Sequence, residues 1–278
     1  MTEPIIKKIY KGKVEIKFFE DSHIYFIRKK VKNDWTDWKR NTGTTTYISI
    51  KDKSRPLIIW AVGLMKDFLL NLKEITPEDI ETGAIQHTIR KEAAATKGDL
   101  AHKWIESYIK AKKGKGEFPE MPEDEDVLIA VNGFMDWIKK HHVSFVDTEK
   151  IIYSLKHDYS GKMDIEAIVE GKRCLVDIKT SNSLYNDVRL QTAAYLMADV
   201  EESGVKYKGR WAVRLAKETE AEYLKRMKKK GVKEIKPYVA FEAVYLDEEK
   251  EFLERDFKAF LACLELFRWN KLTDFWQN

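Results

Sequence analysis

The sequence predicts an α+β fold, close to the α/β class, in which helices flank a mixed β-sheet. Three observations lead to this prediction: strand-like alternation near the N-terminus, a long stretch of helical patterns after it, and strand and helix patterns in turn from about residue 143. With 278 residues, 44% of them hydrophobic, the chain can bury a substantial core. We therefore expect a single domain over residues 1–278, made of an N-terminal hairpin and helical part (1–142) and a core with a C-terminal helix (143–278).

The N-terminal part is expected to begin with a β-hairpin within residues 13–31, whose strands read VEIKFFE and HIYFIRKKV. A polar loop follows, and a helix then opens near Ser54 with Pro56 in its first turn. The expected helices cover about residues 54–72, 76–113 with a break around 97–98, and 125–141. Four tryptophans fall at helical or strand core positions and are expected to pack there: Trp60, Trp104, Trp137 and Trp211.

The core is expected to hold three strands, a helix, a strand, a helix, a strand and a final helix. These elements cover about residues 143–156, 161–169, 172–179, 187–202, 208–216, 219–230, 237–245 and 247–268. With the long helix that precedes them, the order begins αβββαβ. This order indicates a sheet with helices packed on it and excludes a helical bundle or a β-sandwich.

Composition excludes several classes of protein. Two cysteines, Cys174 and Cys263, cannot build a disulfide framework or a four-thiolate metal site, and they indicate a reducing compartment. The N-terminus lacks the apolar core of a signal peptide, and the longest apolar run, at 57–65, is about half a membrane span. We therefore expect no membrane partner and a cytoplasmic location, in a bacterium or a phage-infected host cell.

The stretch most informative about chemistry covers residues 161–181 and reads GKMDIEAIVEGKRCLVDIKTS. If residues 170–171 form a two-residue turn, residues whose numbers sum to 341 stand opposite each other. Asp164 then lies across from Asp177, with Cβ atoms roughly 5 Å apart, and period-2 alternation puts Lys179 on the same face. The opposite face is apolar and is expected to join the core; it comprises Met163, Ile165, Ala167, Val169, Cys174, Val176 and Ile178.

Two carboxylates that face each other across a strand pair repel, and folding does not require them there. A divalent cation between them converts the repulsion into ligation, and hard cations such as Mg²⁺ and Mn²⁺ prefer oxygen ligands. Lys179 could stabilise a developing negative charge or help to orient and deprotonate an attacking water. The alternative is an ordinary polar strand face, on which Asp164 and Asp177 point at solvent and Lys179 pairs with one of them.

This hairpin resembles the signature of the PD-(D/E)XK nuclease superfamily, in which an Asp is followed by a hairpin and then by Asp/Glu-X-Lys. Here Asp164 is followed by Asp177-Ile178-Lys179. The resemblance covers about residues 97–216 and implies a PD-(D/E)XK core with the order helix, three strands, helix, strand. Met163 stands where the superfamily's name has Pro.

Two further motifs resemble the RecB-like exonuclease branch of that superfamily. Gln191 and Tyr195 are similar to its Gln-xxx-Tyr motif, and Gly98-Asp99-Leu100-Ala101-His102 resembles its helical Gly-xxx-His element. The iron–sulphur cysteines of some members are absent, so no cluster is expected.

The resemblance implies a role for each matched residue. His102, Asp164, Asp177 and the Ile178 carbonyl would ligate Mg²⁺ or Mn²⁺, and Lys179 would serve the attacking water. Gln191 and Tyr195, four residues apart on one helix face, would brace the site or touch the substrate, or else simply pack the helix onto the sheet. Glu106, one turn after His102, is a possible second-shell partner or a solvated helix carboxylate. Glu149 is taken to open the first core strand and is a possible additional acid.

Two sets of residues are candidates for contact with nucleic acid. The first set is basic and could follow a phosphate backbone or form a solvated helix end; it comprises Lys225, Arg226, Lys228, Lys229 and Lys230. The second set could form a stacking and charge platform for single strands, or a surface loop whose indoles fold back onto the domain; it comprises Trp35, Trp38, Lys39 and Arg40.

By this resemblance we expect a metal-dependent deoxyribonuclease that hydrolyses phosphodiesters through a metal-bound water. The first expectation is an exonuclease that acts on DNA ends, free or single-stranded, in recombination, repair or phage DNA metabolism, with a possible protein partner in recombination or replication. One alternative is a structure-specific or single-strand endonuclease of the same superfamily. An alternative of another class is a nucleic-acid-binding module without catalysis, whose expected mark is loss of Asp177 or Lys179; both are present.

Overall fold

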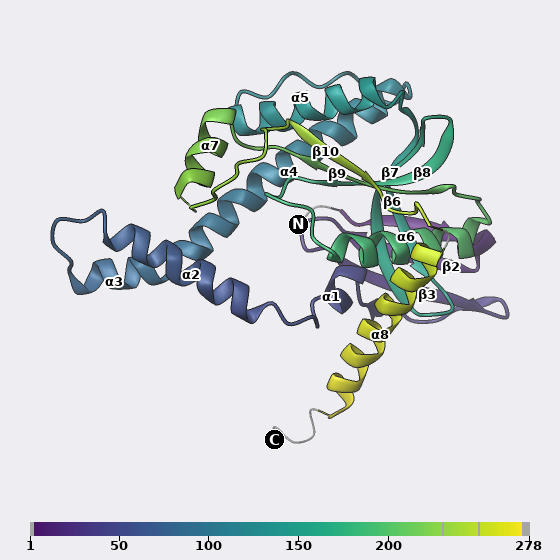
Figure 1. The fold of residues 1–278 in the computed structure, drawn as a ribbon. Coiled ribbons are helices and arrows are strands. Elements are labelled where there is room, and N and C mark those ends of the chain that lie inside the picture. Colours follow the sequence, from purple (N-terminus) through teal and green to yellow (C-terminus); the bar gives the residue numbers. More distant parts are fainter. Residues whose placement is uncertain (1–2, 230, 250, 274–278) are drawn as a thin grey trace.

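A computed structural model describes residues 3–229, 231–249 and 251–273 of the chain. Over these residues the chain forms two five-stranded β-sheets and eight α-helices (Figure 1). The predicted α+β class is therefore confirmed. Among the described residues, no helix combines the length and the apolar character that crossing a membrane requires.

The C-terminal sheet is formed by the strands of the predicted core. Its strands are β6 (Ser144–Ser154), β7 (Tyr159–Val169), β8 (Lys172–Lys179), β9 (Gly209–Leu215) and β10 (Phe241–Tyr245), in the spatial order β10-β9-β8-β7-β6. Neighbouring strands are antiparallel except β8 and β9, which are parallel. A parallel pair needs a crossover connection, and helix α6 (Asp187–Ser203) lies in that connection.

The predicted register of the β7–β8 hairpin is confirmed from Ile165↔Val176 to the turn, and the paired part ends before the expected pair of Asp164 and Asp177. Ile165 pairs with Val176 and Ala167 with Cys174, so the residue numbers of each pair sum to 341 as expected. The two turn residues, Glu170 and Gly171, have φ of 50° and 76°. Positive φ at both positions is what a two-residue turn of this twist requires, and glycine adopts it without steric cost.

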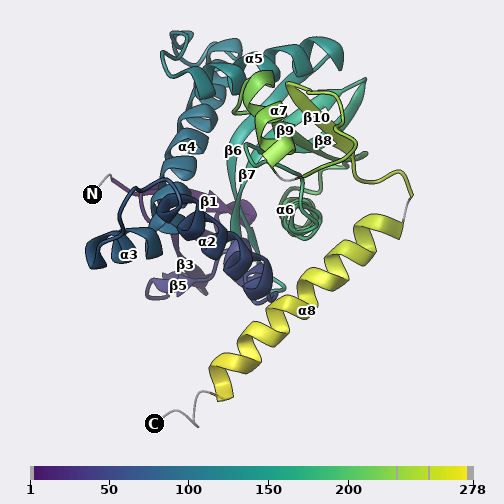
Figure 2. The ribbon, with the colours of Figure 1, turned by 60° about the vertical axis from the view of Figure 1, so that its left-hand side comes forward.

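Helices cover both faces of the C-terminal sheet (Figure 1). On one face, α4 (Gln86–Lys112) and α5 (Glu125–Lys140) pack against β7, β8 and β9. On the other, α6 packs with α1 (Thr44–Ile48) and α8 (Glu251–Thr273). Helix α5 shows why the sequence folds so: its buried residues recur at helical spacing, and the Asp124 carboxylate caps it by accepting a hydrogen bond from the Val127 N–H at 3.1 Å. Figure 2 shows α8 as a long rod whose C-terminal end projects from the body.

The N-terminal sheet contains the predicted hairpin and three further strands. Its strands are β1 (Ile5–Ile9), β2 (Val14–Phe19), β3 (Ile24–Val31), β4 (Asp34–Trp35) and β5 (Lys39–Asn41), with a short 3₁₀ turn at Tyr10–Gly12 between β1 and β2. Strands β2 and β3 agree with the predicted hairpin, whereas β1 was not predicted. One face of this sheet packs against Ile151 and Tyr153 of β6.

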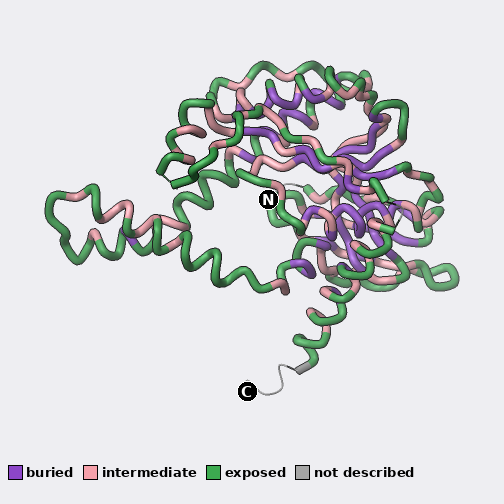
Figure 3. Tube along the Cα trace, in the orientation of Figure 1, coloured by how far each residue is buried: buried purple, intermediate pink, exposed green. Residues whose placement is uncertain are grey.

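Helices α2 (Ser54–Leu69) and α3 (Pro77–Ala84), with the first half of α4, project from the body in Figures 1 and 2. None of the residues of α2 is buried, and Figure 3 shows the projection as mostly exposed. The expectation that Trp60 packs in the core is therefore wrong, because its side chain is 41% exposed on this projection. Trp104 and Trp137 are buried, and Trp211 packs against the same cluster, as expected.

The expected helix break at residues 97–98 is also wrong, because α4 is continuous through it. The boundary falls instead at Ile85, between α3 and α4. Gly98 serves a close approach: a Cβ there would lie 2.9 Å from Thr180 Oγ1, just beyond the end of β8. Glycine thus brings α4, and the residues one turn later, against the carboxyl end of β8.

Candidate metal centre

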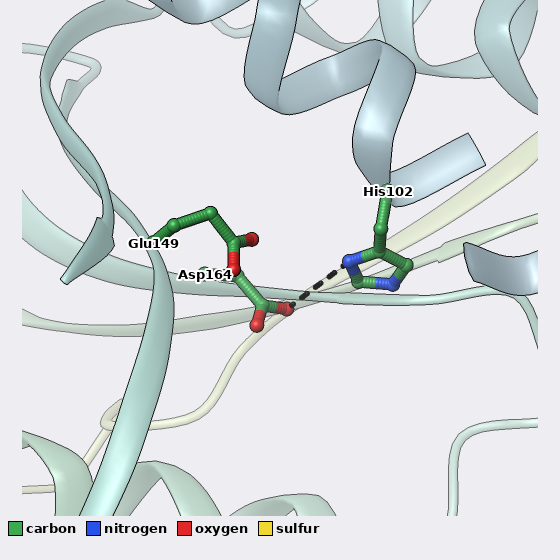
Figure 4. Close-up of side chains that lie close together, drawn as sticks. All are labelled: His102, Glu149 and Asp164. Carbon is green, nitrogen blue, oxygen red and sulfur yellow. Dashed lines mark ion pairs between the residues drawn. The ribbon is translucent and has the colours of Figure 1, made fainter. Parts of the chain in front are cut away.

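Three side chains from three different elements converge on one point. His102 comes from α4, Glu149 from β6 and Asp164 from β7, and Figure 4 shows them pointing toward one another. One ligand atom of each lies within 4.8 Å of those of the other two, and His102 Nδ1 is 4.0 Å from Asp164 Oδ2. Imidazole and carboxylate groups brought together in this way are the kind of donor set that holds a divalent cation.

An irregularity in β6 aims Glu149 at this point. The β6–β7 pairing flanks the position with Thr148↔Ile165 and Lys150↔Met163, and Glu149 itself has a positive φ of 53°. The left-handed conformation is unusual for a residue with a side chain and marks a local distortion of the strand. Glu149 therefore lies in the middle of β6. The expectation that it opens the strand is wrong.

Asp164 is held from both neighbouring strands. On the β6 side, the Thr148 hydroxyl donates a hydrogen bond to the Asp164 carbonyl at 2.9 Å. On the β8 side, the paired register ends at Ile165↔Val176, and the Ile178 N–H donates a hydrogen bond to Asp164 Oδ2 at 2.9 Å. The side chain of Asp164 thus takes the place of a ladder partner, and its carboxylate is fixed beside β8.

The irregular pairing at Asp164 changes the face of β7 on which Met163 lies. Met163 was expected on the apolar face of the hairpin with Ile165 and Ala167. It packs instead in the cluster on the α6 side of the sheet, whereas Ile165 and Ala167 pack on the α4 and α5 side. Regular alternation predicts the faces correctly for the paired part of β7 and fails where the pairing is irregular at Asp164.

Asp177 and Lys179 form an ion pair on β8. The Asp177 side chain is only 1% exposed, whereas that of Lys179 is 29% exposed, and Lys179 Nζ lies 2.6 Å from Asp177 Oδ2. Among the described residues, Asp177 Oδ1 has no hydrogen-bond partner although it is buried. A buried carboxylate oxygen without a partner is costly, and ligation by a cation would remove that cost. Asp177 lies outside the group formed by His102, Glu149 and Asp164.

Burial and the neighbouring carboxylate raise the pKa of Asp177 to about 7, although the Lys179 ammonium opposes this. Burial of Lys179 disfavours its charge, but Asp177 and Asp164 outweigh the burial and raise the pKa of Lys179. Burial and Asp164 likewise raise the pKa of Glu149 to about 7. The site therefore contains more carboxyl groups than its own cations can keep ionised, which is the electrostatic condition that a divalent cation relieves.

Burial lowers the pKa of His102, and Asp164 only partly offsets this. The imidazole is consequently neutral at neutral pH, which is the form that ligates a metal. Glu106 lies one turn later on α4. Within the described residues it forms no hydrogen bond to the imidazole, and its carboxylate accepts a hydrogen bond from Lys110 Nζ at 2.5 Å.

Gln191 and Tyr195 lie together on α6, as their spacing predicted. The Gln191 side-chain amide donates a hydrogen bond to the Tyr195 hydroxyl at 3.0 Å. Burial raises the pKa of the Tyr195 phenol, and Tyr25, Asp164 and Asp177 add to this rise. A Cβ on Gly161 would lie 2.5 Å from the Tyr195 ring, so this glycine on β7 is what admits the ring.

Lys162 is a residue of the site that the sequence did not single out. Its ammonium forms an ion pair with Glu149 and lies 3.4 Å from Glu20 Oε1, in the turn between β2 and β3. Its only signal in the sequence is its place two residues before Asp164, because regular alternation does not hold across Asp164. Through this lysine the N-terminal sheet reaches the candidate metal centre.

A comparison of the chain with protein-family models and with curated proteins finds no match. The chemistry of the site therefore has to follow from its side chains. Carboxylates, one imidazole and a backbone-fixed Asp fit a hard or borderline divalent cation such as Mg²⁺ or Mn²⁺, and they do not fit a soft thiolate-binding metal.

The two sets of candidate nucleic-acid contacts lie on other elements than the three residues of this centre. On α7 (Glu220–Lys229), Arg226 pairs with Glu218, and Lys229 Nζ lies 2.7 Å from Asp67 Oδ2 of α2. Lys225 and Lys228 are exposed, and Lys230 lies outside the described residues. In the other set, Trp35 and Trp38 are half-buried beside cations of the N-terminal sheet, whereas Lys39 and Arg40 are exposed.

Proposed function

We propose that this protein is a metal-dependent deoxyribonuclease, and that it acts as an exonuclease on DNA ends. The observation that carries the proposal is the convergence of His102, Glu149 and Asp164 within 4.8 Å, together with the buried Asp177 and its ion pair with Lys179. The order of these residues along the chain, which resembles the PD-(D/E)XK pattern, supports the choice of phosphodiesters as substrate. Recombination, repair or phage DNA metabolism are the processes in which such an enzyme would act.

His102, Glu149 and Asp164 would hold the cation, with Asp177 as the further carboxylate that the resemblance assigns to it. When bound, the cation supplies Lewis-acid stabilisation of negative charge on the phosphate and lowers the pKa of water. The Ile178 N–H keeps the Asp164 carboxylate oriented through its 2.9 Å hydrogen bond. Because His102 contributes an imidazole nitrogen, we expect Mn²⁺ to be at least as effective as Mg²⁺.

Lys179 is the residue that would act on the phosphate. Its ammonium is held at 2.6 Å from Asp177, and both Asp177 and Asp164 favour its charged form. A positioned ammonium stabilises the charge that develops on the phosphate oxygens, or orients the attacking water. Gln191 and Tyr195 brace the α6 side of the site through their mutual hydrogen bond.

The test is cleavage of end-labelled linear DNA by the purified full-length protein with Mn²⁺, with EDTA and Asp177→Asn as controls. Asp199→Asn is a matched variant, because Asp199 is also buried and also ion-paired to a lysine, with Lys150 Nζ 2.7 Å from its Oδ1. We expect cleavage by the wild-type protein and by Asp199→Asn only. Cleavage that survives Asp177→Asn, or none with either metal on any DNA, would contradict the proposal.

Two further substrates separate the proposed activity from its closest alternatives. Closed circular DNA should stay intact under an exonuclease, whereas an endonuclease of the same chemistry would open it. A labelled RNA in the same assay distinguishes a ribonuclease, which would degrade RNA in preference to DNA.

A further inference from the structure

The N-terminal sheet is a basic region of the chain. Residues 5–41 contain eleven Lys or Arg and only five Asp or Glu, whereas the whole chain has a formal net charge of +4. A local positive excess on one small sheet is the electrostatic footprint of a surface that meets a polyanion.

Alternation along the strands divides this sheet into two faces. One face packs on Ile151 and Tyr153 through residues 14, 16, 18, 25 and 27. The other, which we call the outer face, has neighbouring residues directly paired across strands: Lys17 opposite Phe26, and Phe26 opposite Arg40. The outer face comprises Lys17, Phe19, Phe26, Arg28, Lys30 and Arg40, with Trp35 and Trp38 beside them.

Cations and aromatic rings are interleaved on the outer face. Lys17 Nζ lies 4.2 Å from the centroid of the Trp38 ring, and the Arg28 guanidinium lies 4.6 Å from it and 5.0 Å from the Trp35 ring. Phe19 and Phe26 meet edge to face at 5.9 Å. These rings are half-buried. The tryptophans do fold back onto the sheet, one of the two arrangements expected from the sequence, and they widen its aromatic surface.

Glu15, the acidic residue of β2 on this face, is already neutralised. It is buried and accepts a hydrogen bond from Arg28 Nε at 2.6 Å. It also forms ion pairs with Arg28, whose Nη2 lies 2.5 Å from Glu15 Oε2, and with Lys8, whose Nζ lies 3.7 Å from Glu15 Oε1. Lys17, Lys30 and Arg40 therefore keep positive charge for an external partner. Lys39 differs from its neighbour Arg40, because it pairs with Ile27 and so belongs to the opposite face.

The β2–β3 turn, at one end of the outer face, lies next to the candidate metal centre. Glu20, which follows Phe19 at the end of β2, contacts Lys162, and Lys162 contacts Glu149. From Phe19 the face extends away along β2 and β3 for about 20 Å, at roughly 3.3 Å per residue. A chain bound along the strands would thus point one end toward the centre.

We propose that the outer face binds single-stranded DNA and directs the strand toward the metal centre. Lysine and arginine pair with phosphates, and unpaired bases can stack on flat aromatic rings, whereas a duplex buries the faces of its bases. This inference deepens the proposed function and rests on it for the direction of the strand. Binding itself does not require the cation or cleavage, so the two proposals fail in different ways.

The experiment compares two matched pairs of charge reversals in the full-length protein. Lys30→Glu with Arg40→Glu alters the outer face; Lys29→Glu with Lys39→Glu makes the same charge change at adjacent positions of the same strands, on the other face. Binding of fluorescently labelled oligo(dT) is measured by anisotropy in EDTA over a series of salt concentrations, and thermal melting checks that each variant is folded.

We expect the outer pair to weaken binding at least tenfold and to reduce the slope of log affinity against log salt by roughly 1.4, since each phosphate contact on a single strand contributes about 0.7. The control pair should change affinity less than about threefold. Trp38→Ala should weaken binding about fivefold or more, because stacking on a ring is lost.

Equal losses from the two pairs would overturn the proposal, as would binding of duplex DNA or of oligo(U) more tightly than oligo(dT). If Asp177→Asn loses cleavage but still binds oligo(dT), the result supports the outer face as a binding surface that does not depend on cleavage. Binding by the outer face in a protein that cleaves no DNA would refute the nuclease proposal alone.

Discussion

The two sheets of this protein use their polar residues in opposite ways. The C-terminal sheet has a hydrophobic cluster on each face, whereas the N-terminal sheet packs one face on β6. The C-terminal sheet also buries charge, because the Asp177 side chain is 1% exposed and ion-paired to Lys179. On the N-terminal sheet the charged residues are largely exposed cations, such as Lys30 and Arg40, among half-buried rings.

This difference indicates a division of labour. Buried charges are expensive unless paired or ligated, and the pKa values of two carboxyl groups on the C-terminal sheet rise to about 7, which supports the proposal that this region binds a cation. Exposed cations cost little and contribute little to folding. We infer that the C-terminal sheet performs the chemistry and that the N-terminal sheet holds the substrate.

The largest expected effect is on cleavage. Asp177→Asn and Lys179→Met should each reduce the rate at least roughly 10³-fold, because they remove charge that acts on the reacting phosphate. Both variants should bind oligo(dT) as tightly as the wild-type protein. The division between the two sheets would be wrong if Asp177→Asn or Lys179→Met lost oligo(dT) binding. It would also be wrong if Lys30→Glu with Arg40→Glu lowered the maximal cleavage rate but left the affinity for oligo(dT) unchanged.

The next effect is on stability against pH in the metal-free protein. The pKa of Asp177 rises from an ordinary value near 3.8 to about 7 on folding, so the folded state binds the proton more tightly. This contribution is complete below about pH 4 and is lost as the pH rises through 7, by a few kcal/mol at about 1.4 kcal/mol per pKa unit.

Chemical denaturation of the wild-type protein and Asp177→Asn between pH 4 and 8 measures this contribution. The difference in unfolding free energy between them should shift with pH in that window, and saturating Mn²⁺ should abolish the shift. A difference that stays constant with pH would show that Asp177 is ionised throughout.

A third prediction separates two glutamates of the centre. Glu149→Gln should weaken Mn²⁺ binding about 10- to 100-fold, because a carboxylate ligand becomes a neutral amide. Glu106→Gln is the control; its carboxylate is engaged with Lys110 at 2.5 Å, and affinity should change less than about threefold. Isothermal titration calorimetry gives both constants. Equal losses would place Glu106 among the ligands.

The smallest effect is on packing. Gly161→Ala should destabilise the protein by about 1–3 kcal/mol, because the new Cβ would lie 2.5 Å from the buried Tyr195 ring. Gly63→Ala on the exposed helix α2 meets nothing within 4 Å and should gain about 0.5–1 kcal/mol from helix propensity. Thermal denaturation compares the two. A neutral Gly161→Ala would show that the ring can move.

The sequence predicted the β7–β8 hairpin because its determinants are local. A two-residue turn and strict alternation determine which residues stand opposite each other, and the pairs Ile165↔Val176 and Ala167↔Cys174 follow. His102 was found by its place in an ordered motif. The spacing of Gln191 and Tyr195 by four residues was enough to predict their contact.

What the sequence could not predict depends on non-local geometry. Glu149 was named as a possible additional acid, but its place at the centre goes with a left-handed conformation inside β6 that the local pattern does not indicate. The irregular pairing of β7 at Asp164 places Met163 in the other cluster. Gly98 looked like a helix break, whereas it allows α4 to approach Thr180. The exposure of Trp60 could not be seen either, because an apolar helix pattern does not reveal whether a partner surface lies beside it.

The most direct test of the central claim is the position of Mn²⁺ in crystals of the full-length protein, located by its anomalous scattering. We predict a peak bonded to His102, Glu149 and Asp164, lost in Glu149→Gln crystals grown in the same way. A well-ordered crystal with Mn²⁺ bound elsewhere, and none between these three side chains, would contradict the account.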